Sequence, residues 1–297
     1  MSSNEYIPLK GDSNTFFERL SDYIKRFDSK WENVIKGASN EKIDKYLELA
    51  TQNNKQFVIP KEYFIYLKKM GEDDGGLLVD FIKGSTNIDV LIDYFEDMNK
   101  FPDYYDEIPL NHIVFGHSIE VETDIFLKYY NDFNYEINKT VSINPEFPED
   151  NWFSSTFEKL LFQSVLFKYI GTIKKCVKSC IVPTSYFKEN NVIDTLKIMY
   201  QIDEVCQKYG MMKVWISDQY NYIACNDIGI VYMKLDFNLH GNVWSDDEQF
   251  TIELSNSIKR IWGYGAGISA VPVELGITHD CNYVFLQSAQ QVCRPTE

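Results

Sequence analysis

Hydrophobic residues recur at three- and four-residue spacing along much of this chain, with polar residues between them. This period places the apolar side chains on one face of an α-helix, so it predicts amphipathic helices that pack against a core. The clearest case is residues 87–99, where Ile88, Leu91 and Phe95 share one face and acidic residues occupy the other. One or two further helices are predicted at residues 16–34, and others at residues 39–50, 60–70, 151–167, 185–209 and 246–262.

Short apolar or alternating runs between these helices predict β-strands. We expect strands at residues 77–82, 112–117, 121–127, 140–143, 211–217, 220–225 and 228–237, and two more could lie near 271–277 and 283–286. This mixture of elements indicates an α+β fold. A chain of 297 residues is long enough for two domains, which we place at 1–170 and 171–297, joined by a helix that ends near Val177.

Residues 58–76 form the most distinctive stretch of the chain. Pro60 suits the first turn of a helix, where its missing N–H is not needed, and Tyr63 and Leu67 lie on one apolar face. Gly75 and Gly76 then permit backbone with positive φ, which lets the chain leave the helix sharply. We expect a helix, a glycine turn and the strand at residues 77–82.

A second motif opens the helix that closes the first predicted domain. Ser155 precedes Glu158 by three residues, which is the spacing of a capping box. Phe157, Leu160 and Leu161 supply the apolar side chains of the first turns. We therefore expect Ser155 to cap this helix.

In this order, the motifs resemble the signature of the SUKH superfamily, over about residues 39–168. The matching pieces are a leading helix, a proline–x–x–tyrosine segment, a Gly-Gly turn and a Phe-Glu-x-x-Leu helix, with Asp74 where that signature usually has asparagine. The residues that carry the resemblance are Pro60, Tyr63, Leu67, Gly75, Gly76, Phe157 and Glu158. The resemblance implies a small antiparallel sheet packed with helices. Members include bacterial immunity proteins, which bind and neutralise polymorphic toxins, and yeast cell-wall regulators.

Composition narrows the class of protein. Hydrophobic residues make up 44% of the chain and aromatic residues 15%, which argues for a packed protein and against disorder. No run of about 18 uncharged apolar residues occurs, so we expect no membrane-spanning helix. The first residues lack the basic start and apolar stretch of a signal peptide, and we expect a cytoplasmic protein with its six cysteines reduced.

Charge is unevenly distributed along the chain, whose formal net charge is −15. Residues 1–170 carry 18 basic and 30 acidic side chains, and residues 72–107 alone hold 11 acids against two lysines. Such a surface repels phosphate backbones, which argues against nucleic acid as a partner. It favours a basic protein partner, although acidity could also serve only to keep the protein in solution.

Tyrosines in the same region are candidates for the contact itself, because tyrosine buries a large area at small entropic cost. They could instead fold back onto the core. The residues that we expect to bind a partner are Glu72, Asp73, Asp74, Asp103, Tyr104, Tyr105, Asp106 and Glu107.

Candidate metal ligands are few. Cys176 and Cys180 would share a face of a helix, but a zinc site needs four ligands and no second close pair follows, so small buried side chains are the better interpretation. The acids at positions 120, 122 and 124 alternate along a predicted strand, which is typical of a solvated face. We expect no metal and no cofactor.

Catalytic motifs are equally weak. His279 and Cys281 lie two residues apart with no supporting motif elsewhere, and the glycines at 263–267 lack the Lys-Ser/Thr ending of a phosphate-binding loop. The sequence thus offers no convincing active site and favours a non-catalytic interaction protein. The resemblance implies an immunity protein that binds a polymorphic toxin domain, and the acidic surface suits a basic one, such as a nuclease. The alternatives are a regulatory scaffold and, less favoured, an enzyme that uses the second half. The oligomeric state stays open.

Overall fold

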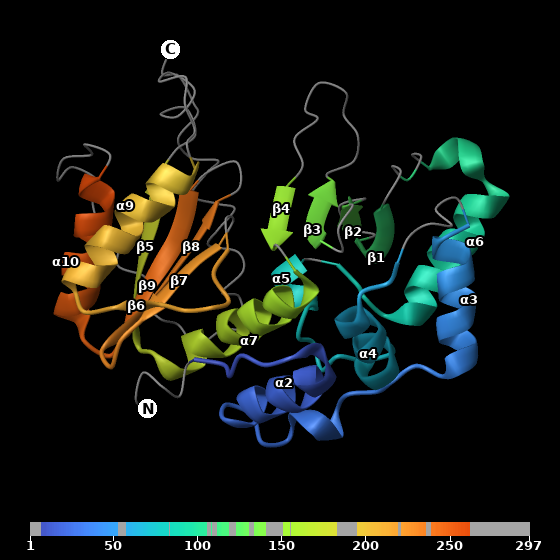
Figure 1. Ribbon diagram of the computed structural model, residues 1–297, viewed down its shortest axis with the longest axis horizontal. Coiled ribbons are helices and arrows are strands. Elements are labelled where there is room, and N and C mark those ends of the chain that lie inside the picture. The colour runs from blue at the N-terminus through green and yellow to red at the C-terminus, as the bar shows by residue number, and fades with distance from the viewer. Residues whose placement is uncertain are drawn as a thin grey trace, which may run out of the picture. The chain divides into compact units, whose positions relative to one another are not determined.

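The computed structural model describes residues 7–52, 58–82, 84–105, 108, 112–118, 123–130, 134–140, 151–154, 156–182, 195–218, 221–235 and 239–261. It confirms the α+β class, because helices accompany two antiparallel sheets (Figure 1). By its internal contacts the chain divides into units 1–264 and 265–297. The second unit, with the strands predicted near 271–277 and 283–286, lies outside the described residues.

Helices α3 (Asn40–Ala50), α6 (Ile88–Lys100) and α10 (Glu248–Arg260) follow the apolar periodicity and begin where a side chain satisfies the backbone. Ser39, Asn87 and Asp247 accept hydrogen bonds from the first backbone N–H groups of α3, α6 and α10. The helices are α2 (Phe16–Lys25), α3 (Asn40–Ala50), α4 (Lys61–Met70), α5 (Val79–Ile82), α6 (Ile88–Lys100), α7 (Phe157–Ile173), α9 (Thr195–Lys208) and α10 (Glu248–Arg260), with 3-10 turns η1 (Ser13–Thr15), η2 (Trp31–Asn33) and η3 (Pro102–Tyr104). None of these helices is long and apolar enough to cross a membrane.

The first sheet is a meander in the order β1-β2-β3-β4, with β1 (His112–Ser118), β2 (Thr123–Tyr130), β3 (Asn134–Thr140) and β4 (Asn151–Ser154). One expectation is wrong here, because residues 151–154 pair with β3 although we predicted a helix from residue 151. Strand β3 itself was not predicted, and of the strand expected at residues 140–143 only Thr140, the last residue of β3, lies within the described residues. Gly116 lies within β1, where the pairing with β2 shifts its register.

The second sheet has the order β5-β9-β8-β7-β6, with β5 (Cys176–Val182), β6 (Met212–Lys213), β7 (Asn221–Cys225), β8 (Gly229–Leu235) and β9 (Leu239–Ser245). The prediction of a helix ending near Val177 is wrong. Helix α7 ends at Ile173, and residues 176–182 pair along their whole length with β9, a strand that the sequence analysis did not predict. Helices α9 and α10 pack on this sheet (Figure 1).

The two faces of the second sheet contribute to different hydrophobic cores. Ala224 belongs to the core under α9 and α10, whereas its neighbour Ile223 belongs to the larger core that also contains Phe162 of α7. Gln163 of α7 donates to the Ile216 carbonyl oxygen at 2.8 Å. The predicted domain boundary near residue 170 thus falls within α7 and beside this shared core, and the two-domain division stays a prediction.

The strand expected at residues 77–82 is wrong, because Val79–Ile82 forms the short helix α5. Asp74 explains the difference. Its carboxylate oxygens accept hydrogen bonds from the backbone N–H groups of Leu77 at 2.9 Å and Leu78 at 3.0 Å, which starts a helical turn. A run of apolar residues does not by itself distinguish a strand from a buried helical turn.

The glycine turn before α5 has the positive φ that the sequence predicted, 68° at both Gly75 and Gly76. Lys168 of α7 donates to the carbonyl oxygens of both glycines, at 2.6 and 2.9 Å. The indole of Trp31 donates to the Asp74 carbonyl oxygen at 3.1 Å. The turn is therefore held by η2 on one side and by α7 on the other.

Aromatic side chains from the resembling motifs meet in the core. Tyr63 and Tyr66 of α4 stack on each other and both contact the Phe157 ring edge-on, at 5.0 and 5.2 Å between ring centroids. Tyr63 also donates to the hydroxyl of Tyr46, which in turn donates to the Val114 carbonyl oxygen at 2.7 Å. These buried hydroxyl groups are satisfied, so the cluster joins α3, α4, β1 and α7 without an unpaired polar atom in this chain of contacts.

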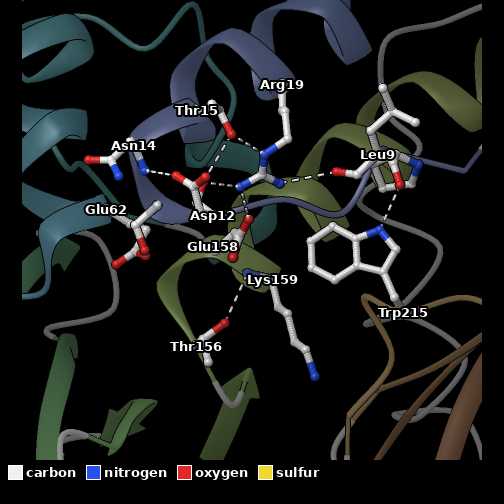
Figure 2. A network of polar contacts seen from close by, with 12 residues as sticks. Leu9, Asp12, Asn14, Thr15, Arg19, Glu62, Thr156, Glu158, Lys159 and Trp215 are labelled. Carbon is white, nitrogen blue, oxygen red and sulfur yellow. Dashed lines mark hydrogen bonds and ion pairs between the residues drawn. The ribbon is translucent and has the colours of Figure 1, made fainter.

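The capping box expected at Ser155 and Glu158 is wrong, because Thr156 is the N-cap of α7 and accepts from the Lys159 N–H at 3.1 Å. Glu158 instead pairs with the buried guanidinium of Arg19 at 2.6 Å (Figure 2). Arg19 donates as well to the carbonyl oxygens of Leu9 and Asp12, at 3.1 and 2.9 Å. This network fastens the N-terminal segment to the start of α7.

Candidate partner-binding surface

Helix α6 has the acidic outer face that the sequence predicted, and much of its charge is paired. Lys42 of α3 lies 2.7 Å from Asp89 and 2.8 Å from Glu72, and Lys45 lies 2.6 Å from Glu96. The hydrogen bond from Lys45 holds the pKa of Glu96 below its usual value. The α3 lysines therefore neutralise part of a surface that looks uniformly acidic in the sequence.

The three acids before the glycine turn lie in different surroundings. Glu72 pairs with Lys36 and Lys42, whose hydrogen bonds lower the pKa of Glu72. Asp73 is exposed, while Asp74 is only 8% exposed and burial raises the pKa of Asp74. Of these three predicted contact residues, only Asp73 has an exposed carboxylate that forms no ion pair with a lysine in the described part of the chain.

The predicted contact residues divide into two groups at opposite ends of α6. The amide of Asn87 donates to the Glu72 carbonyl oxygen at 2.6 Å, so the residues around the turn lie at the start of this helix. Asp103, Tyr104 and Tyr105 follow its end. A 13-residue α-helix is about 20 Å long, which separates the two groups. Predicted positions 106 and 107 lie outside the described residues.

Residues 101–104 follow α6 and carry an exposed pair of aromatic side chains. We call this segment the aromatic tip. Tyr104 is 86% exposed and Phe101 is 54% exposed. Their ring centroids are 6.4 Å apart at an interplanar angle of 81°. Asp103 between them is exposed and forms no ion pair with any residue that the structure describes. Because large side chains at such exposure gain little from folding, the tip is a candidate contact site.

The base of the aromatic tip is anchored. Tyr105 packs edge-on against Tyr94 of α6, with ring centroids 5.5 Å apart, so this predicted contact residue faces inward. Tyr94 donates to the Asp124 carboxylate at 2.7 Å, and the other oxygen of Asp124 lies 2.8 Å from Nδ1 of His117. His117 and Asp124 are register partners on β1 and β2. The sheet therefore fixes the position from which Tyr104 projects.

Other candidate chemistry is weak within the described residues. Cys176 and Cys180 lie on strand β5, not on a helix, and burial raises the pKa of Cys180 to about 12, so its thiol stays protonated. No three histidine, cysteine or acidic side chains in the described ranges are placed to hold a metal ion. His279 and Cys281 lie outside those ranges.

Sequence reasoning missed two residues of this surface. Phe101 was not among the predicted contact residues, yet its ring lies beside that of Tyr104 in the aromatic tip. Asp93 is exposed on α6 and has no ion-pair partner among the described residues. Its spacing of four residues from Asp89 and Asp97 was the available signal, because residues four apart share a helix face.

Comparisons with protein-family models, with curated proteins and with solved structures found no match for this chain. The resemblance to the SUKH superfamily thus rests on the motif residues alone and stays a prediction.

Proposed function

We propose that this protein binds a protein partner through the aromatic tip and performs no catalysis of its own. The observation that carries the proposal is the 86% exposure of Tyr104 on an anchored base. Rigid, exposed aromatic side chains lose little conformational entropy on binding, which is why they dominate many interfaces. Phe101 and Asp103 extend the contact area beside it.

The proposed partner has a basic surface. Asp93 on α6 and Asp103 in the tip are exposed acids without ion-pair partners in the described part of the chain, and the whole chain carries a net charge of −15. Such a field speeds encounter with a positively charged protein. The resemblance to SUKH immunity proteins favours a polymorphic toxin domain, for example a nuclease, as that partner.

A cytoplasmic location is part of the proposal. Cys180, Cys206 and Cys225 are buried free thiols, which suits a reducing compartment. Burial raises the pKa of all three thiols, to between about 11 and about 12, so they remain protonated core residues.

The experiment uses the full-length chain as bait in lysate of the native host, beside the variants Tyr104→Ala and Tyr200→Ala. Tyr200 on α9 is the matched control, because it is also a strongly exposed tyrosine, at 64%. We expect a partner that the wild type and Tyr200→Ala retain and that Tyr104→Ala loses. A hot-spot residue costs about 2 kcal/mol or more when truncated, which weakens binding about 30-fold.

The purified partner then tests charge and biological role. Asp103→Lys should slow its association and flatten the salt dependence of the association rate, while Glu204→Lys on α9 should do so less. If the partner is a toxin domain, its expression should kill cells unless this protein is co-expressed. Equal retention of every partner by wild type and Tyr104→Ala would refute the tip as the binding surface.

A further inference from the structure

We infer that the aromatic tip recognises a guanidinium group, so that an arginine of the partner stacks on Tyr104 and pairs with Asp103. This inference rests on the proposed function and specifies the chemistry of the contact. It distinguishes the tip from an apolar anchor, which would fill a hydrophobic pocket of the partner with the tyrosine ring.

The arrangement of the tip combines the two elements that a cation requires. The Tyr104 ring is open to solvent, and it meets the Phe101 ring nearly at a right angle, with ring centroids 6.4 Å apart. Aromatic faces attract cations within about 6 Å of the ring centre. The exposed carboxylate of Asp103 directly precedes Tyr104 in the same 3-10 turn, so charge and ring face lie on one short segment.

Neighbouring acids favour a cation over an apolar group. Asp97, in the last turn of α6, contacts Lys100 only at 3.5 Å, and both side chains are more than half exposed. Such surface pairs contribute little, so Asp97 can exchange Lys100 for a charge on the partner. An apolar partner would instead remove water from Asp103 without replacing its hydrogen bonds, which is costly.

Arginine fits this site better than lysine. A guanidinium is planar and delocalised, so it can stack on the tyrosine face while its N–H groups form a forked pair with a carboxylate. A lysine ammonium is a compact and strongly hydrated charge, which stacks less well. The anchored base, in which Tyr105 packs on Tyr94 and Tyr94 bonds to Asp124, keeps the tip in place before binding.

The test follows Tyr104 directly in the full-length protein labelled with fluorotyrosine. The Tyr104 fluorine signal is assigned by its loss in Tyr104→Leu. The probe is a short blocked peptide of alternating arginine and glycine, and its control replaces arginine with citrulline, which has nearly the same shape without the charge. We expect the arginine peptide to shift the Tyr104 signal in a saturable manner, and the citrulline peptide to leave it unchanged.

Variants measure the contribution of each group. Asp103→Asn should weaken the binding of the arginine peptide about fivefold, which corresponds to about 1 kcal/mol. The control variant Glu204→Gln on α9 should leave the affinity for this peptide unchanged. A lysine peptide should bind less tightly than the arginine peptide. Equal shifts with the citrulline peptide, or no shift of Tyr104 with the arginine peptide, would overturn the inference.

These outcomes are separable from those of the proposed function. If Tyr104→Ala loses the partner but the arginine peptide does not reach Tyr104, the tip binds by apolar contact and only the present inference fails. If the arginine peptide binds at Tyr104 while Tyr104→Ala retains every partner, the cation site stands and the proposed function fails.

Discussion

Three glycines with positive φ provide a graded test of how the turn before α5 is held. Gly75 and Gly76 have φ of 68° and Gly210, after α9, has φ of 69°, so alanine meets the same backbone strain at each. Their surroundings differ. A Cβ on Gly75 would lie 2.8 Å from Nε1 of Trp31, whereas a Cβ on Gly210 would have no heavy atom within 4 Å.

The expected costs follow from these contacts. Left-handed backbone costs an alanine about 1–2 kcal/mol, partly offset by a less disordered unfolded chain, so Gly210→Ala should lose about 1 kcal/mol. Gly75→Ala must also displace the buried Trp31 ring, at about 1–3 kcal/mol, and weaken its hydrogen bond to Asp74, at about 1 kcal/mol. The total is about 3–5 kcal/mol. Gly76→Ala should fall between them, because its Cβ would meet the amine at the end of the Lys168 side chain at 3.2 Å and Cγ1 of Val79 at 3.8 Å, which is an ordinary contact distance.

Urea unfolding, followed by tryptophan fluorescence and circular dichroism, measures these differences as shifts of the midpoint at constant slope. We expect Gly210→Ala to be the least destabilising variant, Gly76→Ala to be intermediate and Gly75→Ala to be the most destabilising. In a Trp31→Phe background the extra cost of Gly75→Ala should shrink, because Nε1, the atom nearest to the new Cβ, is absent and its hydrogen bond to Asp74 is already lost. If Gly75→Ala costs no more than Gly210→Ala, contact with Trp31 does not hold this turn.

Three further predictions concern charged side chains that are buried or partly buried. Glu158→Gln should lower the free energy of unfolding by about 3 kcal/mol, because it leaves the Arg19 guanidinium buried without its ion pair. In a double-mutant cycle measured by urea unfolding, the variant that combines Glu158→Gln with Arg19→Met should lose less stability than the two single variants lose together. Burial raises the pKa of Asp74, so its contribution to stability is complete below the pKa of the unfolded chain and is lost as pH rises through the folded pKa. Stability curves against pH should show this loss in the wild type and not in Asp74→Asn, and parallel curves would contradict it. Lys168→Met should lower the free energy of unfolding by about 1.5–3 kcal/mol, because the carbonyl oxygen of Gly75 loses a charged hydrogen-bond donor at 2.6 Å. An unchanged Tm in thermal unfolding would show that water replaces the amine.

Local chemistry explains why α3, α6 and α10 could be predicted well. Each has an apolar stripe at helical spacing and a polar side chain that satisfies its first backbone N–H groups, from Ser39, Asn87 and Asp247. Both signals lie within one or two turns of the chain. Distant residues are not needed to read them.

Predictions failed where a distant or unexpected partner decided the conformation. Residues 151–154 became a strand because β3 pairs with them, and residues 176–182 became a strand because β9, about 60 residues later, completes their hydrogen bonds. Residues 79–82 continue the helical turn that the Asp74 side chain starts at Leu77 and Leu78, although their apolar run is equally compatible with a strand. Pairing between strands is non-local, so a short segment does not encode it.

The candidate site shows the same limit. The sequence predicted Tyr104 and Tyr105 as contact residues but not which of the two is exposed, because neighbours in an irregular loop have no fixed period. Tyr94 decides it by packing against Tyr105, which leaves Tyr104 to project. Phe101 gained its role from the same turn, through its ring contact with Tyr104.

The sequence by itself determined the helices with strong periodicity, the glycine turn and the large excess of acidic side chains. Only the tertiary structure decided which acids remain available, because Lys42 and Lys45 of α3 lie more than 40 residues from the α6 acids with which they pair. It also decided that Asp74 caps a buried turn while Asp103 faces water. Composition sets the total charge, but burial and pairing depend on neighbours that only packing brings together.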